Sequence, residues 1–273
     1  MKVSVIVTTY NRPDALASVL RALAAQSERD FEVLVADDGS REDTAALVHQ
    51  MSKAFPVALI HVWQEDAGFR AGAARNRACA KATGDYLIFI DGDCVPLPDF
   101  VERHKQLAEV GWFVAGNRVL LSETFTAKAL AREVPLHLRS KWQWLVDRLQ
   151  GRINRWLPLL KISDATWRKK SPQRWQGART CNLAVWRADF VAVNGFDEAY
   201  AGWGHEDADL AVRLIRQGTR RKDGRFATAV MHLWHRENDR SQLAENVRRL
   251  EQILSGHRIE AQQGLNQYRS QDA

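Results

Sequence analysis

Cysteine is scarce in this chain, and its spacing matches no common use of paired thiols. The 273 residues contain three cysteines, Cys79, Cys94 and Cys181, and no CxxC motif. An odd number of widely separated cysteines argues against a disulfide framework and against a zinc ribbon. We therefore expect three free thiols in a reducing compartment.

Long apolar runs are absent as well. No stretch approaches the roughly 18 apolar residues that a membrane-spanning helix requires. The opening residues, MKVSVIVTTYNR, are too briefly apolar for a secretion signal and lack a small-residue cleavage site. We expect a cytoplasmic protein whose 45% hydrophobic content forms one large α/β domain or two small ones.

Two kinds of nucleotide-recognition signature are missing. No GxGxxG follows the first apolar segment, where TTYNRP stands instead, which argues against a dinucleotide-dependent oxidoreductase. The formal charge of +6 and the isoelectric point near 9.4 favour an anionic partner. No helix-turn-helix, zinc-finger or RNP pattern accompanies that charge, so we expect no nucleic acid, and a nucleic-acid-binding protein is the least favoured alternative.

The chain does contain a regular alternation of short apolar segments. KVSVIVTTY, FEVLVADDGS, VALIHVWQ and DYLIFIDGD are typical of strands, and the segments between them, 14–27, 44–55 and 72–84, are typical of helices. This alternation predicts a mostly parallel sheet flanked by helices. In such sheets, ligands bind beyond the carboxyl ends of the strands.

Polar and acidic groups gather at these strand ends. TTYNR follows the first strand, DDGS the second, and DGD, with Asp91 and Asp93, the fourth. Two carboxylates separated by one glycine repel each other unless a proton or a cation relieves them. Hard oxygen ligands favour Mg²⁺ or Mn²⁺, ions that commonly bridge carboxylates and a diphosphate. The alternative is that Asp-Gly-Asp forms only a solvated turn.

The set of motifs resembles the family 2 glycosyltransferases, which have the GT-A fold, a Rossmann-like α/β fold of nucleotide-diphospho-sugar transferases. The matching segments occur in family order over nearly the whole chain: SVIVTTYNR (4–12), VLVADDGS (33–40), GAARNRA (72–78), DGD (91–93), NGFDEAYAGWGHEDADL (194–210) and MHLWH (231–235). GWGHED also resembles the acceptor-side motif of β-1,4-galactosyltransferases and bacterial chondroitin-type polymerases. The resemblance implies a hexosyltransferase that uses a UDP-sugar donor.

Donor-binding residues follow from that resemblance. It implies that Thr8, Tyr10 and Arg12 line the uridine pocket, and that Asp38 accepts a hydrogen bond from the uracil N3–H. Arg75 is expected to face the nucleotide or its phosphates. The residues themselves leave simpler interpretations open, in which the DDGS acids cap a helix and Arg75 is an ordinary exposed helix residue.

The resemblance also implies a divalent metal site at DGD. Asp93 would be a direct ligand of Mn²⁺ or Mg²⁺, Asp91 would face the ribose and the metal, and His232 or His235 would complete the coordination. Such an ion stabilises negative charge on the departing UDP. Either histidine could instead be a packed strand residue, and their spacing does not choose between them.

The acid pair of GWGHED is implied to act on the acceptor. Asp207 would be the general base, Glu206 would bind a neighbouring hydroxyl or orient the site, and Trp203 and Gly204 would contact the acceptor sugar. In-line attack would invert the anomeric carbon and give a β-linked product. Carboxylates at a helix N-terminus are also ordinary dipole partners. A non-catalytic UDP-sugar or glycan-binding module therefore stays the main alternative.

A basic, tryptophan-rich segment at 122–179 departs from the minimal family pattern. It has thirteen Lys and Arg against four acids, a net charge of +9, and five of the ten tryptophans. We expect a basic helical insertion within one catalytic domain at 1–260, followed by a polar tail at 261–273. Such a composition suits contact with anionic lipid headgroups, but also an anionic glycan, nucleic acid or an ordinary helical subdomain.

The resemblance names the substrates only by class. It favours UDP-galactose or UDP-N-acetylgalactosamine, leaves UDP-glucose and UDP-N-acetylglucosamine open, and implies a surface-glycan acceptor such as lipopolysaccharide or capsule. With the basic segment in mind, we expect peripheral attachment to the inner face of the cytoplasmic membrane, near a lipid-linked acceptor.

Overall fold

A central sheet organises the chain, whose computed structural model describes residues 1–236 and 239–268. Seven strands form this sheet in the order β3-β2-β1-β4-β8-β6-β9. They are β1 (Val3–Thr9), β2 (Phe31–Asp37), β3 (Leu59–Trp63), β4 (Tyr86–Asp91), β6 (Trp112–Ala115), β8 (Asn182–Trp186) and β9 (Arg220–Asp223). A three-stranded sheet, in the order β5-β10-β7, contains β5 (Cys94–Pro96), β7 (Arg118–Leu120) and β10 (Val230–His232).

Strand direction decides what reaches the carboxyl edge of the large sheet. β1 pairs in parallel with β2 and β4, β2 with β3, and β6 with β9. β8 is antiparallel to both β4 and β6, and its first residue, Asn182, lies opposite Ile90 near the end of β4. The sheet is therefore mostly parallel, as predicted, and the residues just before β8 also lie at this edge.

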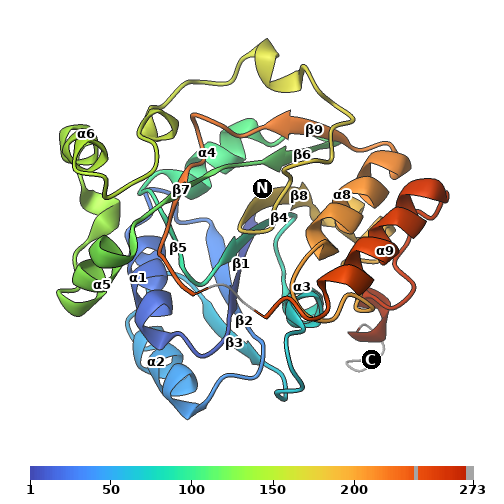
Figure 1. Ribbon diagram of the computed structural model, residues 1–273, viewed down its shortest axis with the longest axis horizontal. Helices are drawn as coiled ribbons and strands as arrows, with labels where there is room; N and C mark the ends of the chain where they lie inside the picture. Colours follow the sequence, from blue (N-terminus) through green and yellow to red (C-terminus); the bar gives the residue numbers. More distant parts are fainter. Residues whose placement is uncertain (237–238, 269–273) are drawn as a thin grey trace.

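Helices cover both faces of the sheet because side chains alternate along each strand. Val5 of β1 packs in the core with α1 (Pro13–Ala24) and α2 (Glu42–Ser52), whereas Ile6 packs in the core with α3 (Ala71–Lys81). Figure 1 shows α1 and α2 on one side of β1 and α3 on the other. The remaining α-helices are α4 (Phe100–Leu107), α5 (Glu123–Ala131), α6 (Lys141–Leu149), α7 (Arg187–Ala192), α8 (Glu206–Gln217) and α9 (Leu243–Ser255).

The segment 122–179 is only partly the helical insertion that we expected. It is helical in α5 and α6, but beyond Leu149 it is largely irregular apart from two short 3₁₀ helices, Leu157–Leu159 and Thr166–Lys169. Prolines within this stretch lack the backbone N–H that an α-helix needs. Arg168 holds it in place instead, since its buried guanidinium donates to the carbonyls of Ile162, Asp223 and Arg225.

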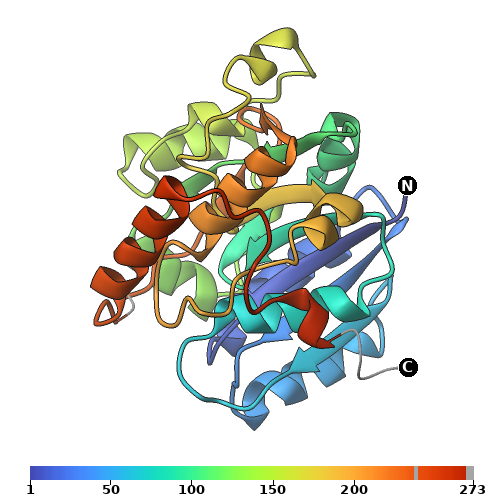
Figure 2. The ribbon, with the colours of Figure 1, turned by 90° about the vertical axis from the view of Figure 1, so that its right-hand side faces the viewer.

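The C-terminal part is more ordered than its polar composition suggested. The amphipathic helix α9 packs on α8, which Figure 2 shows beside it. Part of the predicted polar tail at 261–273 packs on the domain, because Ala261 and Leu265 are buried and Leu265 begins the 3₁₀ helix Leu265–Tyr268. Residues 269–273 of that tail lie outside the described part of the chain.

Two expectations based on absences can be compared with the structure. The three cysteines are free, as predicted, and the structure shows that all three are also buried. Within 1–236 and 239–268, no helix combines the length and the apolar character that crossing a bilayer takes.

Candidate active site

A cavity of about 420 Å³ opens at the carboxyl edge of β1 and β4. It brings together nearly every residue that the sequence analysis singled out, from six separate segments. The cavity is lined by Thr8, Tyr10, Arg12, Asp38, Arg75, Asp91, Asp93, Trp203, Glu206, Asp207, His232 and His235. Gly204 is not among the lining residues.

The guanidinium of Arg75 lies at the centre of the cavity wall. Arg75 is 4% exposed. Its Nε donates to Thr8 Oγ1 at 2.9 Å, Nη2 to Asp91 Oδ1 at 3.1 Å and Nη1 to Glu206 Oε1 at 3.2 Å. The alternative that Arg75 is an ordinary exposed helix residue is wrong, because its guanidinium is buried and each nitrogen donates to a protein oxygen. Arg75 lines the cavity, and its contact with the nucleotide or its phosphates stays a prediction. Burial raises the pKa of Asp91, and the positive charge of Arg75 opposes that rise.

Asp93 lies between the two predicted histidine ligands. His232 Nε2 is 3.6 Å from Asp93 Oδ1, and His235 Nε2 is 3.4 Å from Asp93 Oδ2. Burial lowers the pKa of His232 to about 4, so its imidazole is neutral at pH 7. Asp93, Cys94 and His232 each have a candidate ligand atom within 4.8 Å of the others. A carboxylate oxygen with a neutral imidazole is a donor set that fits Mn²⁺. The residues present therefore fit the implied ion.

The structure also distinguishes the two histidines. His235 Nδ1 lies 2.7 Å from the carbonyl oxygen of Arg236. A hydrogen bond of this kind places the proton on Nδ1 and leaves the lone pair of Nε2 directed at Asp93, as in many metal-binding histidines. This contact favours His235, although both rings stay candidate ligands.

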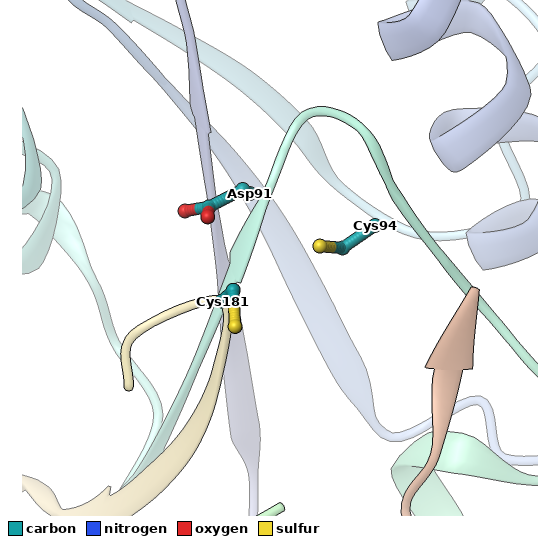
Figure 3. A group of neighbouring side chains, drawn as sticks. All are labelled: Asp91, Cys94 and Cys181. Atoms are coloured by element: carbon teal, nitrogen blue, oxygen red, sulfur yellow. The ribbon is translucent and has the colours of Figure 1, made fainter. Parts of the chain in front are cut away.

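Cys94 and Cys181, far apart in the sequence, meet beside the acids. Their Sγ atoms and a carboxylate oxygen of Asp91 all lie within 4.8 Å of one another, and Figure 3 shows the three side chains as neighbours. The sequence analysis did not predict this proximity, which arises because β5 starts at Cys94 and Cys181 directly precedes β8, which enters at the same edge. Burial raises the pKa of the Cys94 thiol well above its usual range.

The acid pair of GWGHED is presented by a left-handed turn. Gly202, Gly204 and His205 have φ values of 72°, 111° and 75°, and α8 begins at the next residue, Glu206. Such angles suit glycine but strain a histidine. The turn directs Glu206 to Arg75 and Asp207 into the cavity. Burial, with the nearby charge of Glu206, raises the pKa of Asp207 to about 7, which suits a general base at neutral pH.

Among the residues that we predicted to bind a donor, Asp38 is fixed by two hydrogen bonds. Its Oδ1 accepts from Gln64 Nε2 at 2.6 Å and its Oδ2 from the Arg70 backbone N–H at 2.7 Å. Burial raises its pKa to about 6. The helix-cap alternative fails, because α2 begins at Glu42 and no side chain caps it. A free lone pair on each oxygen leaves Asp38 able to accept from a bound base.

The other predicted donor contacts are more exposed. Tyr10 donates through its hydroxyl to Asp66 at 3.0 Å, and Arg12 is paired with Asp14 of α1 at 2.9 Å. Trp203 is partly exposed, and the Arg240 guanidinium lies 5.0 Å from its ring. These side chains form the rim of the cavity, where a substrate could compete for their contacts.

Several residues that line the cavity were not predicted from the sequence. They include Thr9, whose buried Oγ1 has no hydrogen-bond partner among the described residues, and three further cations, Arg118, Arg179 and Arg236. Thr9 ends β1, so the strand-end rule could have found it. Arg118 and Arg179 belong to no motif, and they reach the site only because β7 begins there and the segment before β8 ends there.

Comparisons with known proteins agree with this arrangement. A family described as "Glycosyl transferase family 2" matches residues 4–168, and one described as "N-terminal domain of galactosyltransferase" matches 162–236. Validoxylamine A glucosyltransferase of Streptomyces hygroscopicus subsp. jinggangensis is 30% identical over 223 residues, covering 79% of this chain and 51% of the relative. Chondroitin synthase of Escherichia coli is 27% identical, covering 79% and 32%. The chain thus spans about half or less of these relatives' length.

Solved structures share the fold. The structure of Staphylococcus aureus TarS aligns with this chain with a TM-score of 0.60 and 16% sequence identity. The alignment covers 98% of this chain and 41% of the TarS chain. The mannosyltransferase PcManGT from Pyrobaculum calidifontis, in complex with GDP-Man and Mn²⁺, matches 94% and 62% with a TM-score of 0.58 at 21% identity. This likeness confirms the predicted fold class, that of the GT-A glycosyltransferases.

Proposed function

Because the chain belongs to glycosyl transferase family 2, we propose that it is a metal-dependent, inverting hexosyltransferase that moves a sugar from a UDP-sugar to a glycan hydroxyl. Family membership makes it a transferase. The donor, the ion, the stereochemistry and the acceptor are the proposal. The observation that carries them is a single cavity holding both the Asp93–histidine cluster and the Glu206–Asp207 pair.

A nucleotide-sugar donor and a divalent ion are supported by proteins of the same fold. TarS has been solved in complex with UDP, and PcManGT with GDP-Man and Mn²⁺. The match of residues 162–236 to a galactosyltransferase family supports UDP-galactose or UDP-N-acetylgalactosamine, whereas the glucosyltransferase relative supports UDP-glucose. Asp93 and the two histidines would hold the ion, which would offset the charge on the departing diphosphate.

The acceptor half of the cavity supplies the proton transfer. Asp207, with a pKa of about 7, would take the proton from the acceptor hydroxyl as that oxygen attacks the anomeric carbon. Arg75 holds Glu206 beside it for a neighbouring hydroxyl. Attack by the acceptor oxygen itself, with no enzyme nucleophile in between, inverts the anomeric centre. The chondroitin and hyaluronan synthase relatives support a growing glycan as the acceptor.

The decisive experiment measures UDP release. The purified chain is incubated with each UDP-hexose and UDP-N-acetylhexosamine, in Mn²⁺ or in EDTA, with and without oligosaccharide acceptors. We expect release that needs both Mn²⁺ and an acceptor, and a β-linked product. Asp85→Asn removes a carboxylate at the opposite end of β4 from the cavity. It is the control for the loss of an acid outside the site and should release UDP normally. Donor binding without release in every combination would favour a non-catalytic binding module.

A further inference from the structure

Helix α6 presents an apolar stripe to solvent. Trp142, Val146 and Leu149 are 77%, 46% and 78% exposed. Their spacing of four and three residues places them on one face of the helix. The opposite face is buried through Trp144 and Asp147. The helix is therefore apolar on two sides, and only one of them packs on the protein. Figure 1 shows α6 with α5 at the edge of the molecule, far from α8 and α9.

The stripe is held outward by a rigid helix. Ser140 and Gln143 form a capping box at its start. The buried carboxylate of Asp147 accepts hydrogen bonds from Arg139 Nε at 2.8 Å and from Arg152 Nη1 at 2.9 Å. Trp144 belongs to the main hydrophobic core. With the inner face fixed by a cap, two ion pairs and a core tryptophan, rotation of the stripe into the protein would break all of them.

Exposed Lys and Arg side chains without carboxylate partners among the described residues lie on α6 and on the neighbouring α5 segment. Lys141 and Arg148 of α6 are exposed, and so are Lys128 of the neighbouring α5 and Arg132, the residue that follows α5. None of these four cations lies within ion-pair distance of a carboxylate in the part of the chain that the structure describes. The nearest acid on the same helix, Asp147, is buried and already paired twice.

We propose that this face of α6 docks on an anionic lipid bilayer, lying in the plane of the headgroups. A nine-residue helix is about 13 Å long, too short to span a membrane but sufficient to lie at its surface. Tryptophan prefers the headgroup level, valine and leucine reach the acyl boundary, and Lys and Arg contact anionic lipids. A second copy of the chain is a poorer occupant, because joining two such faces would bring like charges together. The proposal is independent of the transferase activity and would place the enzyme at the membrane that carries a lipid-linked acceptor.

Flotation of the full chain with vesicles tests the proposal without donor or metal. Vesicles of phosphatidylcholine alone are compared with vesicles that also contain phosphatidylglycerol, at low and at high salt. We expect binding to the anionic vesicles that weakens with salt and is at least tenfold weaker on phosphatidylcholine. Trp142→Ser combined with Leu149→Ser should lower the partition coefficient at least tenfold. Lys141→Gln combined with Arg148→Gln should lower it about fivefold per charge on anionic vesicles.

The control is Val110→Ser, on the loop between α4 and β6, which removes an apolar side chain that is 81% exposed. It should float like the parent chain. Each variant is accepted only if its unfolding midpoint matches the parent. No flotation of the parent with anionic vesicles at low salt would overturn the proposal. Flotation that is unaffected by Trp142→Ser combined with Leu149→Ser would also overturn it. So would a parent chain that forms a dimer, does not bind vesicles, and becomes monomeric when these two residues are changed.

Discussion

Asp91 and Glu206 lie on either side of one buried guanidinium. Arg75 Nη2 is 3.1 Å from Asp91 Oδ1 and Arg75 Nη1 is 3.2 Å from Glu206 Oε1. Asp91 ends β4 in the first third of the chain, whereas Glu206 begins α8 more than a hundred residues later. Because a single side chain from α3 joins them, the proposed donor and acceptor halves of the cavity cannot shift independently.

Arg75→Met should be destabilising. It leaves two partly buried carboxylates without their cation, and because breaking a fully buried pair costs about 3–5 kcal/mol, we expect a loss of unfolding free energy at or below the low end of that range. Arg75→Lys keeps the charge but cannot contact both acids with the same fork, so its loss should be smaller. Denaturant unfolding at pH 7.5 measures both. The control is Arg77→Met on the same helix, where the guanidinium stacks on Tyr268 at 4.9 Å. Equal losses for Arg75→Met and Arg77→Met would contradict the bridging role.

The transfer rate should rise with pH through about 7, the pKa of Asp207. Only the ionised carboxylate can accept the proton of the acceptor hydroxyl. Asp207→Asn should bind donor normally, lower the rate about 10²–10⁴-fold and remove this limb of the pH profile. Initial rates at saturating donor, together with a donor-binding titration, provide the check. Wild-type transfer by Asp207→Asn would exclude it as the base.

The same pKa predicts a pH-dependent effect on stability. Burial raises the pKa of Asp207 above its ordinary value of 3.8, so the folded chain binds this proton more tightly than the unfolded chain. Its stabilising contribution is complete below about pH 4 and is lost as the pH rises through about 7. Asp207→Asn, which mimics the neutral acid, should therefore raise Tm at pH 8 and barely change it near pH 4. A shift of the same size at both values would show that Asp207 has an ordinary pKa.

The thiols should be slow to react in the folded protein. Burial raises the pKa values of Cys79 and Cys94, and Cys181 is buried as well. The thiolate is the reactive form, so a disulfide reagent at pH 8 should modify Cys79 and Cys94 only after unfolding. Cys181 lines the cavity, so it should be less protected than the other two. A native sample in which all three thiols react as fast as free cysteine would contradict the burial of Cys79 and Cys94.

Strand-end positions were readable from the sequence because parallel strands end at one edge. Thr8 pairs with Asp91 in the β1–β4 register, so two motifs separated by some eighty residues had to meet. The partners of Arg75 were not readable, since helical periodicity places the residue but not what faces it across the fold. Cys94 and Cys181 were missed for a related reason: nothing in the sequence reveals that β8 runs antiparallel and starts at the site.

Helix α6 shows a second limit. Trp142, Val146 and Leu149 have the spacing of an ordinary core-facing stripe. The buried face is instead the one with Trp144 and the charged Asp147, because Arg139 and Arg152 compensate that carboxylate from outside the helix. Hydrophobic periodicity alone therefore cannot predict which face of α6 is buried, because the ion pairs of Asp147 are formed with arginines outside the helix.

The two histidines near Asp93 should differ in their effect on metal binding. His235 Nδ1 contacts the Arg236 carbonyl, which leaves the lone pair of Nε2 directed at Asp93 Oδ2 at 3.4 Å. His232 has no such contact to its Nδ1 among the hydrogen bonds of the described residues. Removing the group that orients a metal ligand typically lowers metal affinity at least tenfold. Removing the ligand itself should lower the affinity by at least as much. His235→Ala should therefore raise the Mn²⁺ concentration needed to stabilise the UDP complex at least tenfold, and His232→Ala should raise it less. Asp93→Ala should abolish the metal-dependent shift in Tm, and Asp85→Asn should preserve it. A larger effect of His232→Ala than of His235→Ala would identify His232 as the main histidine ligand. A metal-dependent shift in Tm that is unchanged in Asp93→Ala would contradict the proposed metal site.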